Sequence, residues 1–76
     1  MMMMDKVIYI LRKRSKKHIK KTLTEQFNLK LCYDKKAEKI FKNNDILITC
    51  KKKYISILIY DESTQKVAKN IIQSIS

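Results

Sequence analysis

A chain of 76 residues with no glycine, proline or tryptophan is long enough for one domain at most, and it has little mass to enclose a substrate pocket. Apolar residues make up 45% of the sequence, which is enough for a small core and argues against disorder. Lys and Arg number 18 against 7 Asp and Glu, so the formal net charge is +11 and the partners to consider first are polyanions.

The N-terminal residues predict one strand and no membrane segment. Residues 7–11 are a run of β-branched and aromatic side chains, and alternation would turn Val7, Tyr9 and Leu11 toward the core. The apolar stretch is shorter than a membrane span, and it lacks the basic start of a signal peptide. We therefore expect a cytoplasmic or nuclear protein with no membrane partner, and we expect residues 1–5 to be frayed.

A basic helix is predicted to follow this strand, with Ser15 as its N-cap. Between residues 16 and 27, Ile19, Leu23 and Phe27 recur every four positions and form one narrow apolar stripe. Such a stripe fits packing against a sheet, whereas a helix that lies on a membrane surface needs a broad face of bulky apolar residues.

Strand patterns and one ambiguous segment fill the middle of the chain. Residues 29–34 alternate apolar with polar side chains, and residues 46–50 and 54–60 are strong strand runs. Residues 35–43 fit either a short helix or a long connection in which residues 38–42 begin the next strand. The sequence pattern does not decide between these two alternatives.

The C-terminal residues predict a second helix that packs on the sheet. Asp61, Ser63 or Thr64 can cap it, and the apolar residues from Val67 to Ile75 form a wide face. We therefore predict a single α+β domain, with a small antiparallel sheet of three or four strands and two helices packed on one face. The predicted order is αβββα with an extra N-terminal strand. The predicted core comprises Val7, Tyr9, Leu11, Ile19, Leu23, Phe27, Leu29, Leu31, Ile46, Ile48, Ile55, Ile57, Ile59, Val67, Ile71 and Ile75.

The sequence offers no pattern typical of a catalytic or metal-binding site. His18 stands alone on a lysine-rich helix, and the carboxylates are spaced like ordinary turn and capping residues. Cys32 and Cys50 form no CxxC motif, and a zinc site normally needs four ligands. The lack of glycine excludes a Gly-rich loop that cradles phosphates. We therefore predict a protein that is not an enzyme and that uses no metal or cofactor.

The basic residues carry the functional information. The abundance of Lys, Ile and Asn is typical of an AT-rich coding sequence, for example a viral one, but AT bias does not deplete Asp and Glu comparably. No acid interrupts residues 12–21, and further clusters lie at residues 35–42 and at residues 51–53, a predicted hairpin tip. Phosphate groups can neutralise these clusters of Lys and Arg, so we predict that the protein binds nucleic acid, either RNA or DNA. The predicted contact residues in these segments are Arg12, Lys13, Arg14, Lys16, Lys17, Lys20, Lys21, Lys51, Lys52 and Lys53.

Two stretches carry a family resemblance. Residues 64–72 (TQKVAKNII) are similar to the pattern Ser-Lys-Lys-x-Ala-Lys-x-x-Ala, and residues 23–27 (LTEQF) are similar to a Leu-x-Glu helix. Both patterns belong to the double-stranded-RNA-binding domain, which the predicted order of helix, three strands and helix over residues 16–76 also resembles. The chain departs from the family where Gln65 replaces the first lysine, and where the loop after the first family strand lacks Gly, Pro and His.

This resemblance implies that Gln65, Lys66 and Lys69, at the start of the last helix, contact the phosphates of double-stranded RNA. A second hypothesis is a small viral or mobile-element accessory protein that binds and modulates an acidic protein partner. In that case residues 7–11 would form an exposed edge strand, and this strand would pair with the partner's sheet or with a second copy of the chain in a homodimer.

Overall fold

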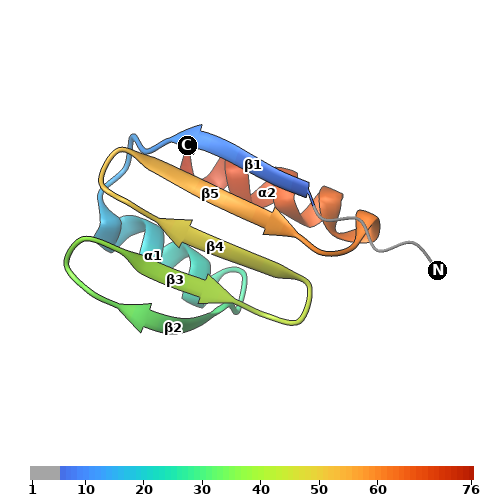
Figure 1. Cartoon of the computed structure of the whole chain (residues 1–76), viewed down its shortest axis with the longest axis horizontal. Coiled ribbons are helices and arrows are strands. Elements are labelled where there is room, and N and C mark those ends of the chain that lie inside the picture. The colour runs from blue at the N-terminus through green and yellow to red at the C-terminus, as the bar shows by residue number, and fades with distance from the viewer. Residues whose placement is uncertain (1–5) are drawn as a thin grey trace.

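The computed structural model describes residues 6–76, so the expectation of frayed residues 1–5 lies outside the described part of the chain. In chain order the elements are β1 (Lys6–Leu11), α1 (Lys16–Glu25), β2 (Lys30–Asp34), β3 (Lys39–Lys42), β4 (Ile46–Cys50), β5 (Tyr54–Ile59), a 3₁₀ turn (Glu62–Thr64) and α2 (Gln65–Ile75). The strands form one sheet in the order β1-β5-β4-β3-β2, and every neighbouring pair is antiparallel. Both helices lie behind the sheet in Figure 1, which confirms the α+β class with a five-stranded sheet in place of three or four strands.

The additional strand comes from the segment that the sequence left ambiguous. Lys39–Lys42 pairs with both β2 and β4, so the second alternative for residues 35–43 is the correct one. A strand turns adjacent side chains to opposite faces of the sheet, which explains why Phe41 is completely buried while Ile40 is only half-buried. The order from α1 onward is therefore αββββα, with four strands between the helices instead of three.

The expected orientation of β1 is wrong by one residue. Ile8 and Ile10 face the helices, because the register pairs them with fully buried isoleucines of β5. Val7, Tyr9 and Leu11, expected in the core, point away from the helices and are 47%, 67% and 71% exposed. Because the whole run is apolar, its periodicity cannot orient the strand, and the register with β5 decides the matter.

Most of the remaining predicted core is confirmed. Alternate residues of β4 and β5 are buried against α1 and α2. Val67 is 44% exposed instead of buried, because Ala68, Ile71 and Ile75 form the stripe of α2 that faces the sheet. The buried apolar residues are Ile19, Leu23, Leu29, Phe41, Ile46, Ile48, Cys50, Ile55, Ile57, Ile59, Ala68, Ile71 and Ile75.

Helix α1 begins and ends with side-chain and backbone caps that need no glycine. Ser15 accepts a hydrogen bond from the backbone N–H of His18 at 3.1 Å, which confirms the predicted N-cap. After the last turn Asn28 adopts a left-handed φ of 56°, and the N–H of Leu29 donates to the carbonyl of Leu23 at 3.0 Å. Asparagine thus fills the position that glycine usually takes, and it directs the chain into β2.

Candidate nucleic-acid interface

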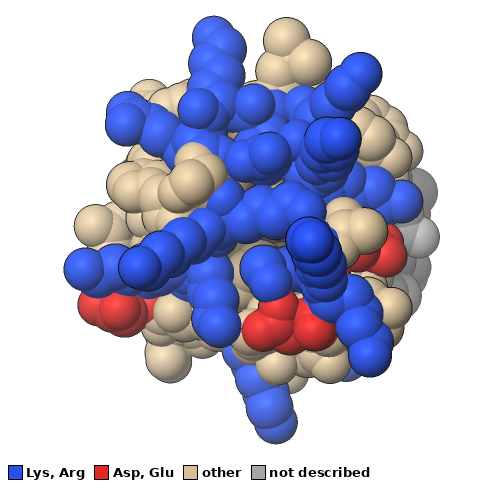
Figure 2. Space-filling model, turned by 90° about the vertical axis from the view of Figure 1, so that its left-hand side faces the viewer, with Lys and Arg blue, Asp and Glu red and all other residues tan. Residues whose placement is uncertain are grey.

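The strand directions bring three connections to one end of the sheet. Since neighbouring strands are antiparallel, β1, β2 and β4 end where β3 and β5 begin, which gathers residues 12–15, 35–38 and 51–53. Figure 2 views the molecule from this side, and Lys and Arg cover most of it. We call this surface the basic end. Its basic residues come from the three connections, from the start of α1 and from the two lysines paired with Asp34 at the end of β2: Arg12, Lys13, Arg14, Lys16, Lys17, Lys20, Lys35, Lys36, Lys39, Lys51, Lys52 and Lys53.

Arg12 joins the connection after β1 to the hairpin tip between β4 and β5. Its Nε donates to the carbonyl oxygens of Lys51 at 3.1 Å and Lys52 at 2.8 Å. Its Nη1 donates to the carbonyl of Arg14 at 2.6 Å, and its backbone N–H donates to the carbonyl of Lys53 at 2.9 Å. The guanidinium of Arg12 therefore holds two loops together, in addition to carrying charge.

Two further cations at the basic end bind backbone carbonyls from distant segments. Arg14 Nε donates to the carbonyl of Ser76 at 3.1 Å, which ties the connection after β1 to the end of α2. Lys16 Nζ donates to the carbonyl of Lys36 at 2.6 Å, which ties the start of α1 to the connection between β2 and β3. Both side chains are predicted nucleic-acid contacts, and both already stabilise the arrangement of the loops.

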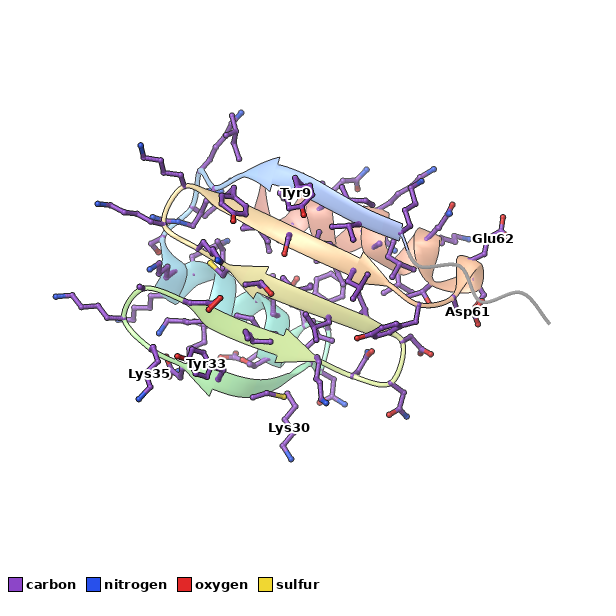
Figure 3. All side chains as sticks on the ribbon, in the orientation of Figure 1. Tyr9, Lys30, Tyr33, Lys35, Asp61 and Glu62 are labelled. Carbon is purple, nitrogen blue, oxygen red and sulfur yellow. The ribbon has the colours of Figure 1, made fainter. Side chains whose placement is uncertain are left out.

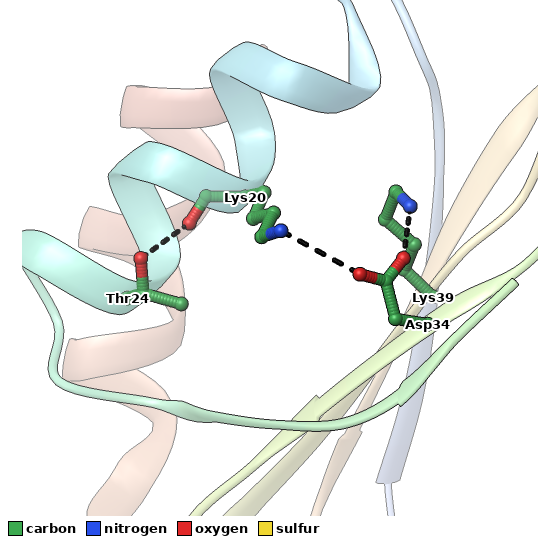
Figure 4. A network of polar contacts seen from close by, with 4 residues as sticks. All are labelled: Lys20, Thr24, Asp34 and Lys39. Atoms are coloured by element: carbon green, nitrogen blue, oxygen red, sulfur yellow. Dashed lines mark hydrogen bonds and ion pairs between the residues drawn. The ribbon is translucent and has the colours of Figure 1, made fainter.

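Asp34 is one of two carboxylates that compensate part of this charge. One of its oxygens lies 3.5 Å from Lys20 Nζ, and the other is bonded to Lys39 Nζ (Figure 4). The hydrogen bond from Lys39 holds the pKa of Asp34 below its ordinary value, against a smaller opposing effect of desolvation, and Lys20 adds to the lowering. In the same view Thr24 Oγ1 donates to the carbonyl of Lys20 at 2.8 Å, within α1.

Glu38 is the second carboxylate, and its Oε2 lies 3.7 Å from Lys51 Nζ. Most of the other amines at the basic end bind no protein atom. Within residues 6–76, six of them form neither an ion pair nor a side-chain hydrogen bond, and all six side chains are exposed. These free amines, which we call the unpaired lysines, belong to Lys13, Lys17, Lys35, Lys36, Lys52 and Lys53.

The three residues that the family resemblance singles out lie elsewhere. Gln65, Lys66 and Lys69 occupy the start of α2, whereas it is the end of α2 that reaches the basic end through Ser76. Figure 3 shows their neighbours Asp61 and Glu62 on the side of the molecule opposite Lys35. The predicted contact residues therefore divide into a group at or beside the basic end and a separate group that follows two carboxylates.

The sequence prediction noted the lysines of residues 35–42 but did not include them among the contact residues. The structure adds Lys35, Lys36 and Lys39 to the basic end, because β2 and β3 form a hairpin that turns there. Lys21 lies beside the basic end, where it lines a shallow hollow on α1 with Lys17 and Lys20. A strand assignment for residues 38–42 would have located the missing lysines from sequence alone.

Groups that could perform chemistry are dispersed. Within residues 6–76 no three His, Cys, Asp or Glu side chains come close enough to hold a metal ion. His18 is exposed on α1, and Cys32 and Cys50 are separate free thiols. Burial raises the pKa of the Cys50 thiol, which disfavours the reactive thiolate. Neither helix in this part of the chain has the length and apolar character needed to cross a membrane.

Comparison of the chain with protein-family models, with curated proteins and with solved structures found no match. Functional inference therefore starts from the geometry and charge of the chain itself. The outstanding feature of the described residues is an end of the sheet where twelve basic side chains gather and where two carboxylates, Asp34 and Glu38, pair with three of them.

Proposed function

We propose that this protein binds nucleic acid through the phosphate backbone, with the basic end as the contact surface. The observation that carries the proposal is the set of six unpaired lysines, which come from three separate loops and from α1. Ammonium groups crowded in this way repel one another, and a polyanion relieves that repulsion. Hydrogen-bonded Arg12, Arg14 and Lys16 support the proposal, because they fix the loops that present the free amines.

Salt dependence tests the proposal directly. Each phosphate that a lysine neutralises releases a counterion, so the logarithm of the association constant falls linearly with the logarithm of salt concentration. We expect the full chain to bind a fluorescein-labelled oligonucleotide of about 16 nucleotides with a steep negative slope in an anisotropy titration. An affinity that does not change with salt would overturn the proposal.

A matched pair of double variants locates the contact surface. Lys52→Gln with Lys53→Gln removes two charges from the basic end, and we expect the slope to become shallower by about 1.5. Lys66→Gln with Lys69→Gln removes two charges from α2, and we expect an unchanged slope. A reversed outcome would place the contacts at the start of α2, as the double-stranded-RNA-binding resemblance implies.

An acidic protein is the alternative ligand for the same charge. β1 is an edge strand of the sheet, so a partner's strand has access to it. Affinity purification of the tagged full chain with and without nuclease treatment separates the two ligands. Under our proposal, nuclease releases the bound material, whereas a partner protein that stays attached after nuclease treatment would favour the accessory-protein hypothesis.

A further inference from the structure

Residues 6–76 leave the face of the sheet opposite the helices uncovered, and the register shows which side chains form it. One row across the sheet runs through Tyr33, Ile40, Thr49, Ser56 and Tyr9. A second row, two residues further from the basic end, runs through Lys30, Lys42, Leu47, Leu58 and Val7. We call this surface the open face; it is turned toward the viewer in Figures 1 and 3.

Three tyrosines on the open face expose much of their surface. Tyr9 is 67% exposed, Tyr33 is 43% exposed and Tyr54 is 38% exposed. Tyr9 and Tyr54 are diagonal neighbours on β1 and β5, with ring centroids 6.0 Å apart and planes tilted by 59°. The side of each ring that is not packed is therefore available to a flat ligand.

The spacing of these rings suits several bases and not one. Tyr33 and Tyr9 stand at the two edges of the five-stranded sheet, in the same row. Four strand spacings separate them, which is about 19 Å between their backbones. Between them lie Ile40 beside Tyr33 and then the smaller side chains of Thr49 and Ser56. A strand of nucleic acid that crosses the sheet can therefore place different bases on the different tyrosines.

The open face is continuous with the basic end. Tyr54 directly follows the hairpin tip and, together with residues 51–53 and Glu38, it lines a shallow hollow. Lys30 and Lys42 flank the other side of the face. Within the described strands no Asp or Glu points to the open face, and Glu38 at its border is paired with Lys51.

We propose that the open face binds single-stranded nucleic acid, with bases stacked on Tyr9, Tyr33 and Tyr54. The inference rests on the proposed function, since the phosphates of the same strand lie on the unpaired lysines of the basic end. Stacking on aromatic side chains beside a positively charged surface is the general physical basis of single-strand binding. A duplex keeps the flat faces of its bases inside its own stack, so it cannot use these rings.

Charge favours this occupant over a second copy of the chain. A homodimer through the open face would bring together two chains that each carry a net charge of +11. It would also enclose Lys30 and Lys42, for which the strands of the open face offer no carboxylate partner. A nucleic-acid strand supplies both the apolar base faces and the negative charge.

The test compares one labelled oligonucleotide as a single strand and as a duplex, bound by the full chain at several salt concentrations. We expect tighter binding of the single strand, and we expect Tyr9→Leu and Tyr33→Leu each to weaken it about tenfold while leaving duplex affinity unchanged. Leucine keeps an apolar side chain at each site and removes the aromatic ring. Val67→Ala is the control, because it trims an exposed apolar residue on the helix side.

Tyrosine fluorescence gives a second readout, because the chain has four tyrosines and no tryptophan. Stacked bases should quench the emission of the unmodified protein, and Tyr9→Leu should remove part of that quenching. If the single strand and the duplex bound equally, with salt dependence and with no effect of the tyrosine substitutions, this inference would be overturned and the proposed function would stay intact. No salt-dependent binding of either form would overturn both, and a concentration-dependent dimer that Tyr9→Leu abolishes would assign the face to a second copy.

Discussion

The two ends of the sheet build their turns with opposite chemistry. At the far end, acceptor side chains bind backbone N–H groups: Asn43 Oδ1 accepts from Asp45 at 2.8 Å and from Ile46 at 3.0 Å. Asp61 Oδ1 similarly accepts from the N–H of Ser63 at 3.2 Å. At the basic end, apart from the N-cap Ser15, donor side chains bind backbone carbonyls instead, and Arg12 is the main example.

This difference determines how the charge at each end should be interpreted. Among the described residues the far end comes close to balancing its charges, since Lys6, Lys30, Lys42, Lys66 and Lys69 stand against Glu25, Asp45, Asp61 and Glu62. The basic end carries a large excess, but part of that excess organises loops that have no glycine or proline to shape them. A cationic surface can therefore contain both structural cations and free ones, and only the free ones are available to a ligand.

When a structural cation and a free cation are each replaced by alanine, the largest difference that we expect is in stability. Arg12→Ala removes the hydrogen bonds to the carbonyls of Lys51, Lys52 and Arg14, so we expect the free energy of unfolding to fall by about 2 kcal/mol. Urea denaturation followed by circular dichroism measures this change. Lys13→Ala is the matched control, and its exposed side chain should contribute less than about 0.5 kcal/mol.

In the nucleic-acid titration the order of these two variants should be reversed, with the larger change in Lys13→Ala. Lys13→Ala should make the salt slope shallower by about 0.9, since its free amine is available to a phosphate. If Arg12→Ala and Lys13→Ala were equally stable, Arg12 would belong with the free cations, and the distinction between the two kinds would fail.

A smaller effect is expected at the far end. Asn43→Ala leaves the N–H groups of Asp45 and Ile46 without their side-chain acceptor, and we expect a loss of about 1 kcal/mol in the free energy of unfolding. Asn44→Ala, at the neighbouring exposed position, should change it by less than about 0.5 kcal/mol. Neither variant should alter nucleic-acid affinity. If Asn43→Ala lost affinity under conditions in which it is fully folded, the proposed contact surface would extend to this end.

The sequence was sufficient to predict a strand and its buried face wherever the residue pattern was compatible with a single structure. The isoleucines of β4 and β5 recur at every second position, and Thr49 and Ser56 stand between them in the middle of each strand, so their common face followed from period two. The runs at Val7–Leu11 and residues 35–43 were different. An all-apolar strand has no period to orient it, and the adjacent Ile40 and Phe41 fit a helix stripe as well as two faces of a strand.

The basic end was predicted in composition but not in arrangement. The acid-free segment from residue 12 to residue 21 signalled charge in excess, which is a property of the sequence. That Arg12 would bind the carbonyls of a hairpin tip forty residues away is a property of the fold, and no local pattern carries it. The placement of Lys66 away from the basic end was open to prediction, because the predicted strand of residues 54–60 carries the chain away from the hairpin tip before that helix begins.

The smallest effect concerns Asp34, the carboxylate that pairs with Lys20 and Lys39 at the basic end. Because its pKa is lowered in the folded protein, Asp34 contributes stability above about pH 4, where it is ionised in both the folded and the unfolded chain. As the pH falls below the unfolded value, the unfolded chain takes up the proton first, and the contribution is lost. We therefore expect the melting temperature of the unmodified protein to exceed that of Asp34→Asn slightly near neutral pH, with the difference shrinking in acid.

Asp45→Asn is the control for this measurement, since Asp45 lies at the far end and its side chain forms no ion pair within residues 6–76. Its melting temperature should follow that of the unmodified protein throughout the titration. Asp34→Asn also frees Lys20 and Lys39 from their carboxylate, so it should bind nucleic acid more tightly and with a steeper salt slope. If instead removal of this carboxylate weakened binding, Asp34 would be positioning Lys20 and Lys39 for the phosphates, and it would belong to the contact surface together with the cations.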